Sequence, residues 1–373
     1  MPRRRPRNKD YTDLLDHERS VGDAQQKDNR GANDEKFGKR SKYHQHNKTL
    51  RTAAERMNDA RLSAEKKKLP IGEILQVYSL YLEVREGVGD RSGEHLLCTA
   101  RRTMRKVISE EMGELVVGDV IRYRPTGGTA DLPSRETDEG ETLSLPEAVI
   151  ESAEPRKTVL MRLDSFDENK LDPIVANAEQ FMIVVSLHNP FPRWGLVDRM
   201  LVAAQTGGLE PVVIVNKADL RDVAENLEQT EEAVAHYNAL GHRALLTSVE
   251  SGEGLDELLE LLAGKVTVLA GHSGVGKSSM IRAVQPKLDL AVGAVSEAHQ
   301  KGRHTTTSAR RYELEHERGG AVIDTPGVKL FGLAGVSAED LDGFFPDVAA
   351  GNAPEWRAEN YRRILESLPA ADD

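Results

Sequence analysis

Runs of apolar residues alternate with helix-like segments through the second half of the chain. The clearest strand-like runs are 181–185, 211–215 and 266–270, and the segments 197–206 and 255–262 have helical periodicity. Continuous apolar strands separated by helices are typical of a parallel sheet covered on both faces. The pattern therefore predicts a three-layer α/β fold of the nucleotide-binding type.

The stretch before this half has a different character. Short β-prone runs at 74–78, 95–98 and 120–123 are separated by turns rich in Gly and Asp, and Leu115–Asp119 resembles a turn that closes one strand. Strands at this spacing predict a small all-β barrel over residues 71–150. Five-stranded barrels of the OB type often bind oligonucleotides, although a fold by itself does not establish that activity.

The first 70 residues are polar and basic. They carry 19 Lys and Arg against 11 Asp and Glu, an excess of +8, so the net charge of −11 for the whole chain leaves −19 for the remainder. We expect a largely disordered arm. It is either a solubilising extension with one helix near 52–67, or a flexible arm that neutralises RNA phosphates in a salt-sensitive manner.

Composition bears on the number of domains and on the cellular compartment of the protein. A chain of 373 residues exceeds what one hydrophobic core usually serves, which predicts two or three domains. Its single cysteine, Cys98, cannot form an internal disulfide, and no apolar run approaches the roughly 18 residues that span a bilayer. The basic start is not followed by an apolar segment of the secretory kind. We therefore expect a cytoplasmic protein without a membrane partner.

One sequence, GHSGVGKS, fits the phosphate-binding loop of nucleoside triphosphatases and follows an apolar strand, as such a loop must. Its glycines would let backbone N–H groups surround the phosphates, Lys277 would reach the β- and γ-phosphates, and the Ser278 hydroxyl would bind Mg²⁺. An ordinary glycine turn is the alternative. The candidate nucleotide contacts are Gly271, His272, Ser273, Gly274, Val275, Gly276, Lys277, Ser278 and Ser279.

The choice of base follows from the tetrapeptide Asn-Lys-Ala-Asp directly after the strand at 211–215. A carboxylate only accepts hydrogen bonds, so Asp219 can pair with the N1–H and amine of guanine, whereas adenine would leave its charge unpaired. Lys217 can lie over the base, and Asn216 can tie this loop to the phosphate loop. A plain surface turn is the alternative interpretation.

Three further loops are compatible with a GTP-dependent switch. The first, Thr247–Val249, would offer a backbone N–H of Ser248 or Val249 to the guanine O6. The second, Asp324–Gly327, holds an aspartate for Mg²⁺ and a glycine, Gly327, whose N–H would meet the γ-phosphate. The third, Gly302–Thr307, is rich in hydroxyls, and Thr306 is favoured over Thr305 as a ligand of Mg²⁺.

The order of these motifs differs from that of ordinary Ras-like GTPases. There the phosphate loop comes first and the guanine loop late, whereas here Asn216–Asp219 precedes Gly271–Ser278 and Asp324–Gly327 comes last. Because the termini of compact domains often lie close together, a displaced chain break need not alter the sheet. The order predicts a circularly permuted GTPase.

These residues resemble the circularly permuted RsgA family of small-subunit ribosome biogenesis GTPases. The resemblance spans roughly residues 72–335 and part of the C-terminus, and it rests on Gly302–Thr307, on Ser273–Ser279, on the motif order and on a barrel ahead of the GTPase domain. It implies an OB-type barrel, GTP, GDP and Mg²⁺ as ligands, and binding to the 30S subunit and its 16S rRNA. It also implies GTPase activity stimulated by that subunit and a role in its late maturation. A monomer and no DNA partner are expected.

One departure concerns the C-terminus. Members of the family usually carry a zinc finger of three cysteines and one histidine there, whereas no Cys or His follows His316 in this chain. No zinc is expected at that position. The segment 336–369 would instead form a shortened helical cap, with Trp356, Tyr361, Ile364 and Leu365 as its packing residues.

The residue after Gly327 bears on the rate of hydrolysis. Many GTPases place a glutamine there to orient the attacking water, but this chain has Val328, which predicts slow intrinsic turnover. Acceleration would come when a partner orders the loop that holds Arg303 and His304. His304 would position the water or simply make a structural hydrogen bond, Arg303 would stabilise charge in the transition state or bind an RNA phosphate, and Lys277 would hold the phosphates.

The sequence therefore predicts four parts. They are a basic arm over 1–70, a barrel over 71–150, a permuted α/β GTPase domain with a mostly parallel sheet over 154–335, and a short helical segment over 336–373. Two alternatives to a small-subunit factor stay open. One is a permuted GTPase that matures the large subunit, and the other is a nucleotide-gated RNA-binding scaffold with incidental hydrolysis.

Overall fold

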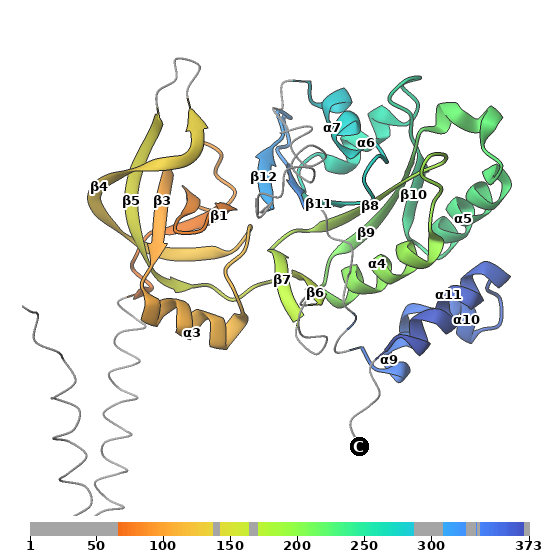
Figure 1. The fold of residues 1–373 in the computed structure, drawn as a ribbon, viewed down its shortest axis with the longest axis horizontal. Coiled ribbons are helices and arrows are strands. Elements are labelled where there is room, and N and C mark those ends of the chain that lie inside the picture. Colours follow the sequence, from red (N-terminus) through yellow and green to blue (C-terminus); the bar gives the residue numbers. More distant parts are fainter. Residues whose placement is uncertain are drawn as a thin grey trace, which may run out of the picture. The chain divides into compact units, whose positions relative to one another are not determined.

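The computed structural model describes residues 66–136, 142–163, 171–286, 309–325, 333 and 336–368. Lys66–Asp373 form one compact unit, shown in Figure 1. The expected arm and its helix near 52–67 lie almost entirely outside the described residues. Among the described residues, no helix is both long and apolar enough to cross a bilayer.

Five strands at the start of this unit close on themselves. β1 pairs with β2, β2 with β3, β3 with β5, β5 with β4, and β4 again with β1. The elements are β1 (Ile71–Val77), β2 (Leu82–Glu86), β3 (His95–Ala100), α3 (Arg102–Met112), β4 (Val120–Glu136) and β5 (Thr142–Ala153). The side chains that fill the barrel include Ile74, Val84, Cys98, Ile121 and Ile150. The strands expected at 74–78, 95–98 and 120–123 are confirmed, while the OB type of the barrel stays a prediction.

The turn expected at Leu115–Asp119 is held by its own aspartate. The Asp119 carboxylate accepts from the Val116 N–H at 2.8 Å, and Arg156 donates to it at 2.7 and 2.8 Å. Gly118 has φ 88°, and a Cβ there would lie 1.9 Å from the Ala176 carbonyl oxygen. The turn therefore needs glycine, and it fixes where β4 begins.

A hairpin of β6 (Val159–Leu163) and β7 (Leu171–Ala176) leads from the barrel into the second sheet region. There the strand order is β10-β9-β8-β11-β13-β12, parallel except for the last pair. The strands are β8 (Gln180–Ser186), β9 (Glu210–Asn216), β10 (Arg243–Leu246), β11 (Val266–Ala270), β12 (Arg310–Glu313) and β13 (Ala321–Asp324). The strands expected at 181–185, 211–215 and 266–270 are confirmed.

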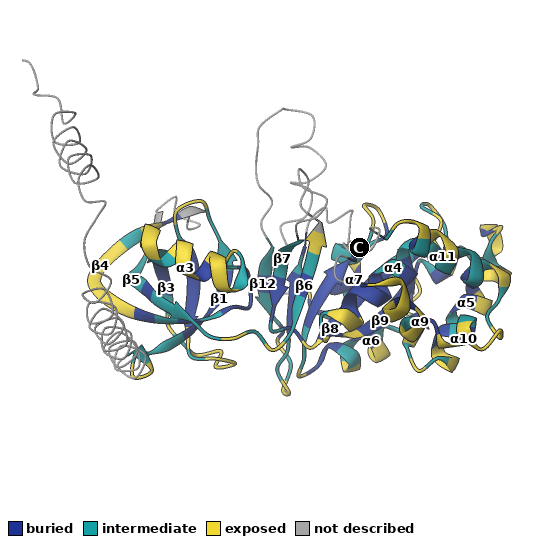
Figure 2. Ribbon diagram, turned by 90° about the horizontal axis from the view of Figure 1, so that it is seen from below, coloured by how far each residue is buried: buried dark blue, intermediate teal, exposed yellow. Residues whose placement is uncertain are grey.

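Alternate residues of the buried strands face opposite sides of this sheet, as the two-residue period of a strand requires. Phe181 and Ile183 pack in one core, whereas Met182 and Val184 pack in the other. Figure 2 shows these strands buried between helices whose outer sides are exposed. The helices are α4 (Trp194–Thr206), the 3₁₀ helix η2 (Ala218–Val223), α5 (Leu227–Ala239), α6 (Leu255–Leu262) and α7 (Lys277–Val284). Apolar strands buried on both faces explain the sequence pattern.

The C-terminal segment is helical and packs on the face that holds α4. It consists of α9 (Ala338–Phe344), α10 (Pro346–Ala349) and α11 (Glu355–Glu366). Ile364 is buried in the core with α4, and the partly buried Trp356, Tyr361 and Leu365 pack against it. The expected cap and its four packing residues are therefore confirmed. We call α9 to α11 the C-terminal cap.

Buried charges also fasten the C-terminal cap to the sheet domain. Arg357 on α11 pairs with Asp198 on α4 and, at 3.0 Å, with Asp347 on α10. Asp347 also lies 2.7 Å from His236 on α5, and Asn360 donates to Asp198 at 2.7 Å. Since a buried charge without a partner is costly, these contacts fix how the cap docks.

Candidate functional site

The candidate motifs gather where parallel strands end. β9 and β11 both run in the same direction as β8, and β13 runs parallel to β11. Loops that follow such strands lie along one edge of the sheet, which is where open α/β sheets bind their ligands. The guanine-loop, phosphate-loop and aspartate candidates therefore share one edge.

The candidate phosphate loop joins β11 to α7 by a tight path. Gly271 has φ 158°, and a Cβ there would lie 2.1 Å from the Val184 carbonyl oxygen. Gly276 has φ 93°, and a Cβ there would lie 2.4 Å from the Asn216 side-chain nitrogen. Both glycines are required by backbone conformation and by close packing. The loop ends at Lys277, the first residue of α7, so that Ser278 and Ser279 lie on its first turn.

Lys277 lies folded over the loop that precedes it. Its Nζ donates to the Gly271 carbonyl at 2.7 Å and to the His272 carbonyl at 3.3 Å. Burial lowers the pKa of Lys277, and the nearby carboxylate of Asp324 opposes that change. Burial conversely raises the pKa of Asp324, against the charge of Lys277. Two half-buried groups of opposite charge thus interact at the loop.

The candidate guanine loop is tied directly to the phosphate loop. The Asn216 Nδ2 donates to the Val275 carbonyl at 2.9 Å, and the Thr247 hydroxyl donates to the Asn216 Oδ1 at 3.3 Å. Asn216 and Thr247 are both buried. Lys217 has φ 64°, an uncommon conformation for a residue other than glycine. The three loops after β9, β10 and β11 are therefore joined through one asparagine.

Asp219 meets the third of these loops. It lies in η2, and its Oδ1 accepts from the Ser248 hydroxyl at 2.5 Å. The Ser248 hydroxyl in turn accepts from the Ser251 N–H at 3.1 Å, and the Ser248 N–H donates to the Glu253 carbonyl at 2.9 Å. Asp219 is exposed, so its remaining acceptor sites are open to a ligand.

The loop after β8, which the sequence did not predict as part of the site, also contacts these residues. The Lys217 Nζ donates to the carbonyl of Asn189, just after β8, and the Ser186 hydroxyl donates to the Pro190 carbonyl at 2.7 Å. A Cβ on Gly274 would lie 3.9 Å from Pro190. The available signal was the Asn-Pro pair at the end of a predicted strand, but the contact uses a backbone carbonyl that any residue could supply.

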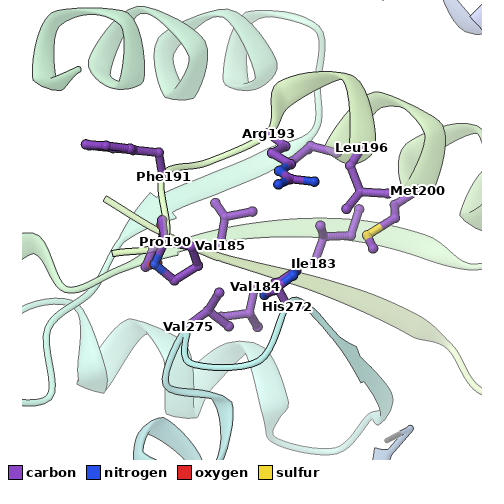
Figure 3. A pocket seen from close by; sticks show the side chains of 13 residues that line it. Ile183, Val184, Val185, Pro190, Phe191, Arg193, Leu196, Met200, His272 and Val275 are labelled. Carbon is purple, nitrogen blue, oxygen red and sulfur yellow. Dashed lines mark hydrogen bonds between the residues drawn. The ribbon is translucent and has the colours of Figure 1, made fainter. Parts of the chain in front are cut away.

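An apolar pocket flanks the phosphate loop. Figure 3 shows that Pro190, Phe191, Leu196, Met200 and Val275 line it, with Arg193 at its side. Its walls come from β8, the loop between β8 and α4, α4 itself and the phosphate loop. A mostly apolar lining does not suit a triphosphate, so the candidate phosphate site is the loop itself rather than this pocket.

Four of the catalytic and switch candidates fall in segments that the structure does not describe. Arg303, His304, Thr306 and Gly327 lie outside the described residues. Of the three candidate magnesium ligands, Ser278 and Asp324 are described. Within the described ranges there is no group of three or more His, Cys, Asp or Glu side chains that could hold a metal ion. Among the described residues, Ser278 and Asp324 are therefore the candidates that could contribute to a magnesium site.

Comparisons with known proteins show the family to which the chain is related. The sequence profile of the RsgA GTPase family matches residues 153–334. A small ribosomal subunit biogenesis GTPase RsgA of Photorhabdus laumondii is 35% identical over 300 residues, covering 73% of this chain and 78% of the relative. The RsgA of Ectopseudomonas mendocina is 33% identical over 327 residues, covering 81% of this chain and 86% of the relative.

Solved structures show the same likeness. YjeQ from Thermotoga maritima superposes with a TM-score of 0.56 at 27% identity, covering 80% of this chain and 97% of that one. YloQ, described as a circularly permuted GTPase, superposes with a TM-score of 0.53 at 22% identity, covering 80% and 94%, and supports the fold alone.

Proposed function

Because this chain belongs to the RsgA family of GTPases, we propose that it hydrolyses GTP on the small ribosomal subunit and assists the late maturation of that subunit. Membership makes it a guanine-nucleotide-binding enzyme that converts GTP and water to GDP and phosphate. The names of its relatives do not favour a large-subunit factor or a scaffold with incidental hydrolysis.

The single observation that carries the site assignment is the hydrogen bond from Asn216 to Val275. It supports one pocket in which Asp219 selects guanine, Lys217 lies over the base and Lys277 holds the phosphates. Because the Ser248 N–H already donates to Glu253, the Val249 N–H is the better candidate to meet the guanine O6. The phosphates would be wrapped by the backbone of Gly271, His272, Ser273, Gly274, Val275, Gly276, Ser278 and Ser279, with Gly327 at the γ-phosphate.

The residues present fit a magnesium ion. Burial raises the pKa of the Asp324 carboxyl, and a bound cation would favour its charged form. Ser278 on the first turn of α7 and Thr306 would supply hydroxyl ligands. Bound Mg²⁺ supplies neutralisation of charge on the phosphate oxygens. The protein supplies the rest: Lys277 pairs with the phosphates, and the backbone amides orient them for attack by water.

The rate of GTP hydrolysis would depend on binding of the small subunit. Val328 follows Gly327 where many GTPases use glutamine, and a valine side chain cannot orient water, so we expect slow intrinsic turnover. His304 would position water and Arg303 would stabilise the transition state once the subunit orders their loop. The barrel and the basic arm would contact 16S rRNA, in a cytoplasmic monomer that uses no zinc.

The test is multiple-turnover phosphate release by the full chain with GTP alone, with purified small subunits and with purified large subunits. We expect slow release alone and acceleration by small subunits only. Acceleration by large subunits instead would favour the large-subunit alternative. Equal rates in all three conditions would favour a scaffold with incidental hydrolysis.

A further inference from the structure

β12 lies between the barrel and the nucleotide-binding sheet. Its Arg310 is in register with Gln76 of β1 on one side and with Asp324 of β13 on the other. Asp324 is the residue proposed to meet Mg²⁺. One row of paired residues therefore runs from the barrel to the nucleotide edge.

Little backbone pairing joins β12 to the barrel. Between β1 and β12 the register holds the single pair Gln76 and Arg310. Arg91 adds two exposed hydrogen bonds, at 3.4 and 3.2 Å, to the carbonyls of His316 and Gly320, and its Nε lies 3.7 Å from a carboxylate oxygen of Glu313. Side chains must therefore provide much of the attachment of β12 to the barrel.

Four charged side chains form a closed ring at this junction, which we call the junction ring. Arg85 lies 3.0 Å from Glu73 and 2.7 Å from Glu313, and Arg311 pairs with Glu73 and lies 2.7 Å from Glu313. Glu73 and Arg85 belong to the barrel, whereas Arg311 and Glu313 belong to β12. Each arginine thus contacts one glutamate on its own side of the junction and one on the other side.

The junction ring is mostly removed from water. The side chains of Glu73, Arg85 and Arg311 are 6%, 1% and 5% exposed, and that of Glu313 is 30% exposed. Burial alone would raise the pKa of Glu313, but Arg311 and Arg85 outweigh it and lower that pKa. A buried ring of charges often contributes no more stability than well-packed apolar residues would, and its best-attested use is to set register or to switch.

We propose that the junction ring couples the barrel to the nucleotide site by positioning β12, and through it Asp324. This proposal rests on the proposed function in one respect only, because it takes the small subunit as the partner that binds the barrel. When the nucleotide state shifts β13, the paired strand β12 moves with it and changes the ring contacts to β1 and β2. Since coupling between two sites is reciprocal, a partner bound to the barrel biases the position of Asp324 by the same free energy.

Variants with identical composition can test this. The half-swapped variant, Arg311→Glu with Glu313→Arg, keeps the pair within β12 but turns the two cross-junction attractions of the ring into repulsions. The fully swapped variant adds Glu73→Arg and Arg85→Glu, which restores both attractions of the ring. The longer contact of 3.7 Å between Arg91 and position 313 becomes repulsive in both variants, so it does not distinguish them. Asp198→Asn is the matched control, because it alters a buried ion pair between α4 and the C-terminal cap rather than at the junction.

The first measurement is hydrogen exchange of the full chain with GDP and with a non-hydrolysable GTP analogue. In the natural chain, the fully swapped variant and Asp198→Asn, we expect the two nucleotides to give different protection of amides in Ile71–Val77 and Leu82–Glu86. The half-swapped variant should lose that difference while its affinity for both nucleotides changes less than about threefold. A half-swapped variant that keeps the difference, or a natural chain that never shows it, overturns the proposal.

The second measurement is phosphate release with small subunits. The half-swapped variant should lose about tenfold of the stimulation, at unchanged intrinsic rate, and the fully swapped variant should regain it. If the half-swapped variant fails to fold, Glu73→Gln with Arg311→Gln replaces it under the same expectations. A natural chain with nucleotide-dependent exchange but no response to subunits would refute the partner and leave the coupling standing.

Discussion

At the scale of residues, Asn216 joins the candidate guanine loop to the phosphate loop and to the loop after β10. Replacement by Ala removes the bond to the Val275 carbonyl and leaves that carbonyl and the Thr247 hydroxyl buried without this partner. An unsatisfied buried group costs about 1.5 kcal/mol, and the same loss in the nucleotide complex corresponds to roughly tenfold weaker binding. We expect Asn216→Ala to lower both thermal stability and GTP affinity.

Asn238→Ala is the matched control. It removes bonds of the same kind, at 2.9 and 2.7 Å to the Val234 and Ala244 carbonyls, away from the nucleotide edge. It should lower stability without lowering GTP affinity. Equal affinities of the two variants in a nucleotide titration would show that the loops are not held together by Asn216.

His304 gives a second prediction at this scale. If it positions the attacking water, His304→Ala should lower subunit-stimulated turnover by about 100-fold while the slow intrinsic rate stays nearly unchanged. The intrinsic rate of the same preparation serves as the control for folding. Stimulated phosphate release equal to that of the natural chain would assign His304 a structural hydrogen bond instead.

Residues of the site differ in how far the sequence predicts them. Lys277, Asp219 and Asn216 could be predicted because their chemistry depends on side-chain type at fixed spacing. The participation of Asn189 could not, since it contacts Lys217 through a carbonyl that every residue carries. The roles of all these residues toward a nucleotide, like those assigned to Arg303, Thr306 and Gly327, stay predictions.

At the scale of elements, the buried strands of the sheet were predictable because both of their faces are apolar. β2 and β12 were not, because they carry Arg85, Arg311 and Glu313 of the junction ring, and charge on a strand is typical of an exposed edge. In the structure these charges are paired and mostly buried, which a single sequence does not reveal. The C-terminal cap was predicted as helical, but its ion pairs across α4, α5 and α10 depend on tertiary packing.

The C-terminal cap should be sensitive to acid. Burial alone would raise the pKa of Asp347, but the hydrogen bond of His236 and the charge of Arg357 outweigh it and lower that pKa. A lowered carboxyl pKa contributes stability that is present above the unfolded value of about 4 and is lost as pH falls through the native value. Asp198 acts in the opposite sense, since burial raises its pKa despite Arg357.

The variant Asp347→Asn isolates one of these groups. We expect it to be less stable than the natural chain by about 2 kcal/mol at neutral pH, and the difference should shrink below about pH 4. Fluorescence can follow the cap, because Trp356 lies 6.1 Å from Trp194, centre to centre, and the chain has two tryptophans. A difference that stays constant between pH 7 and pH 3 would contradict the assignment to Asp347.

At the scale of the whole molecule, charge is divided unevenly. Residues 1–70 carry an excess of +8 in a chain whose net charge is −11. If the arm neutralises RNA phosphates, removal of residues 1–65 should weaken binding to small subunits. The slope of the logarithm of the binding constant against the logarithm of the salt concentration should also become shallower, by about 0.9 for each phosphate contact that is lost. Sedimentation binding assays at several salt concentrations measure both. An unchanged slope would favour a solubilising extension.

The central claim is that one pocket selects guanine, holds the triphosphate and answers to the small subunit. It is tested most directly by phosphate release from GTP and from xanthosine triphosphate, with small subunits present, for the natural chain, Asp219→Asn and the control Asp222→Asn. The natural chain and the control should use GTP, and Asp219→Asn should prefer xanthosine triphosphate and remain stimulated by the subunit. An Asp219→Asn variant that keeps the natural preference for GTP would contradict the account.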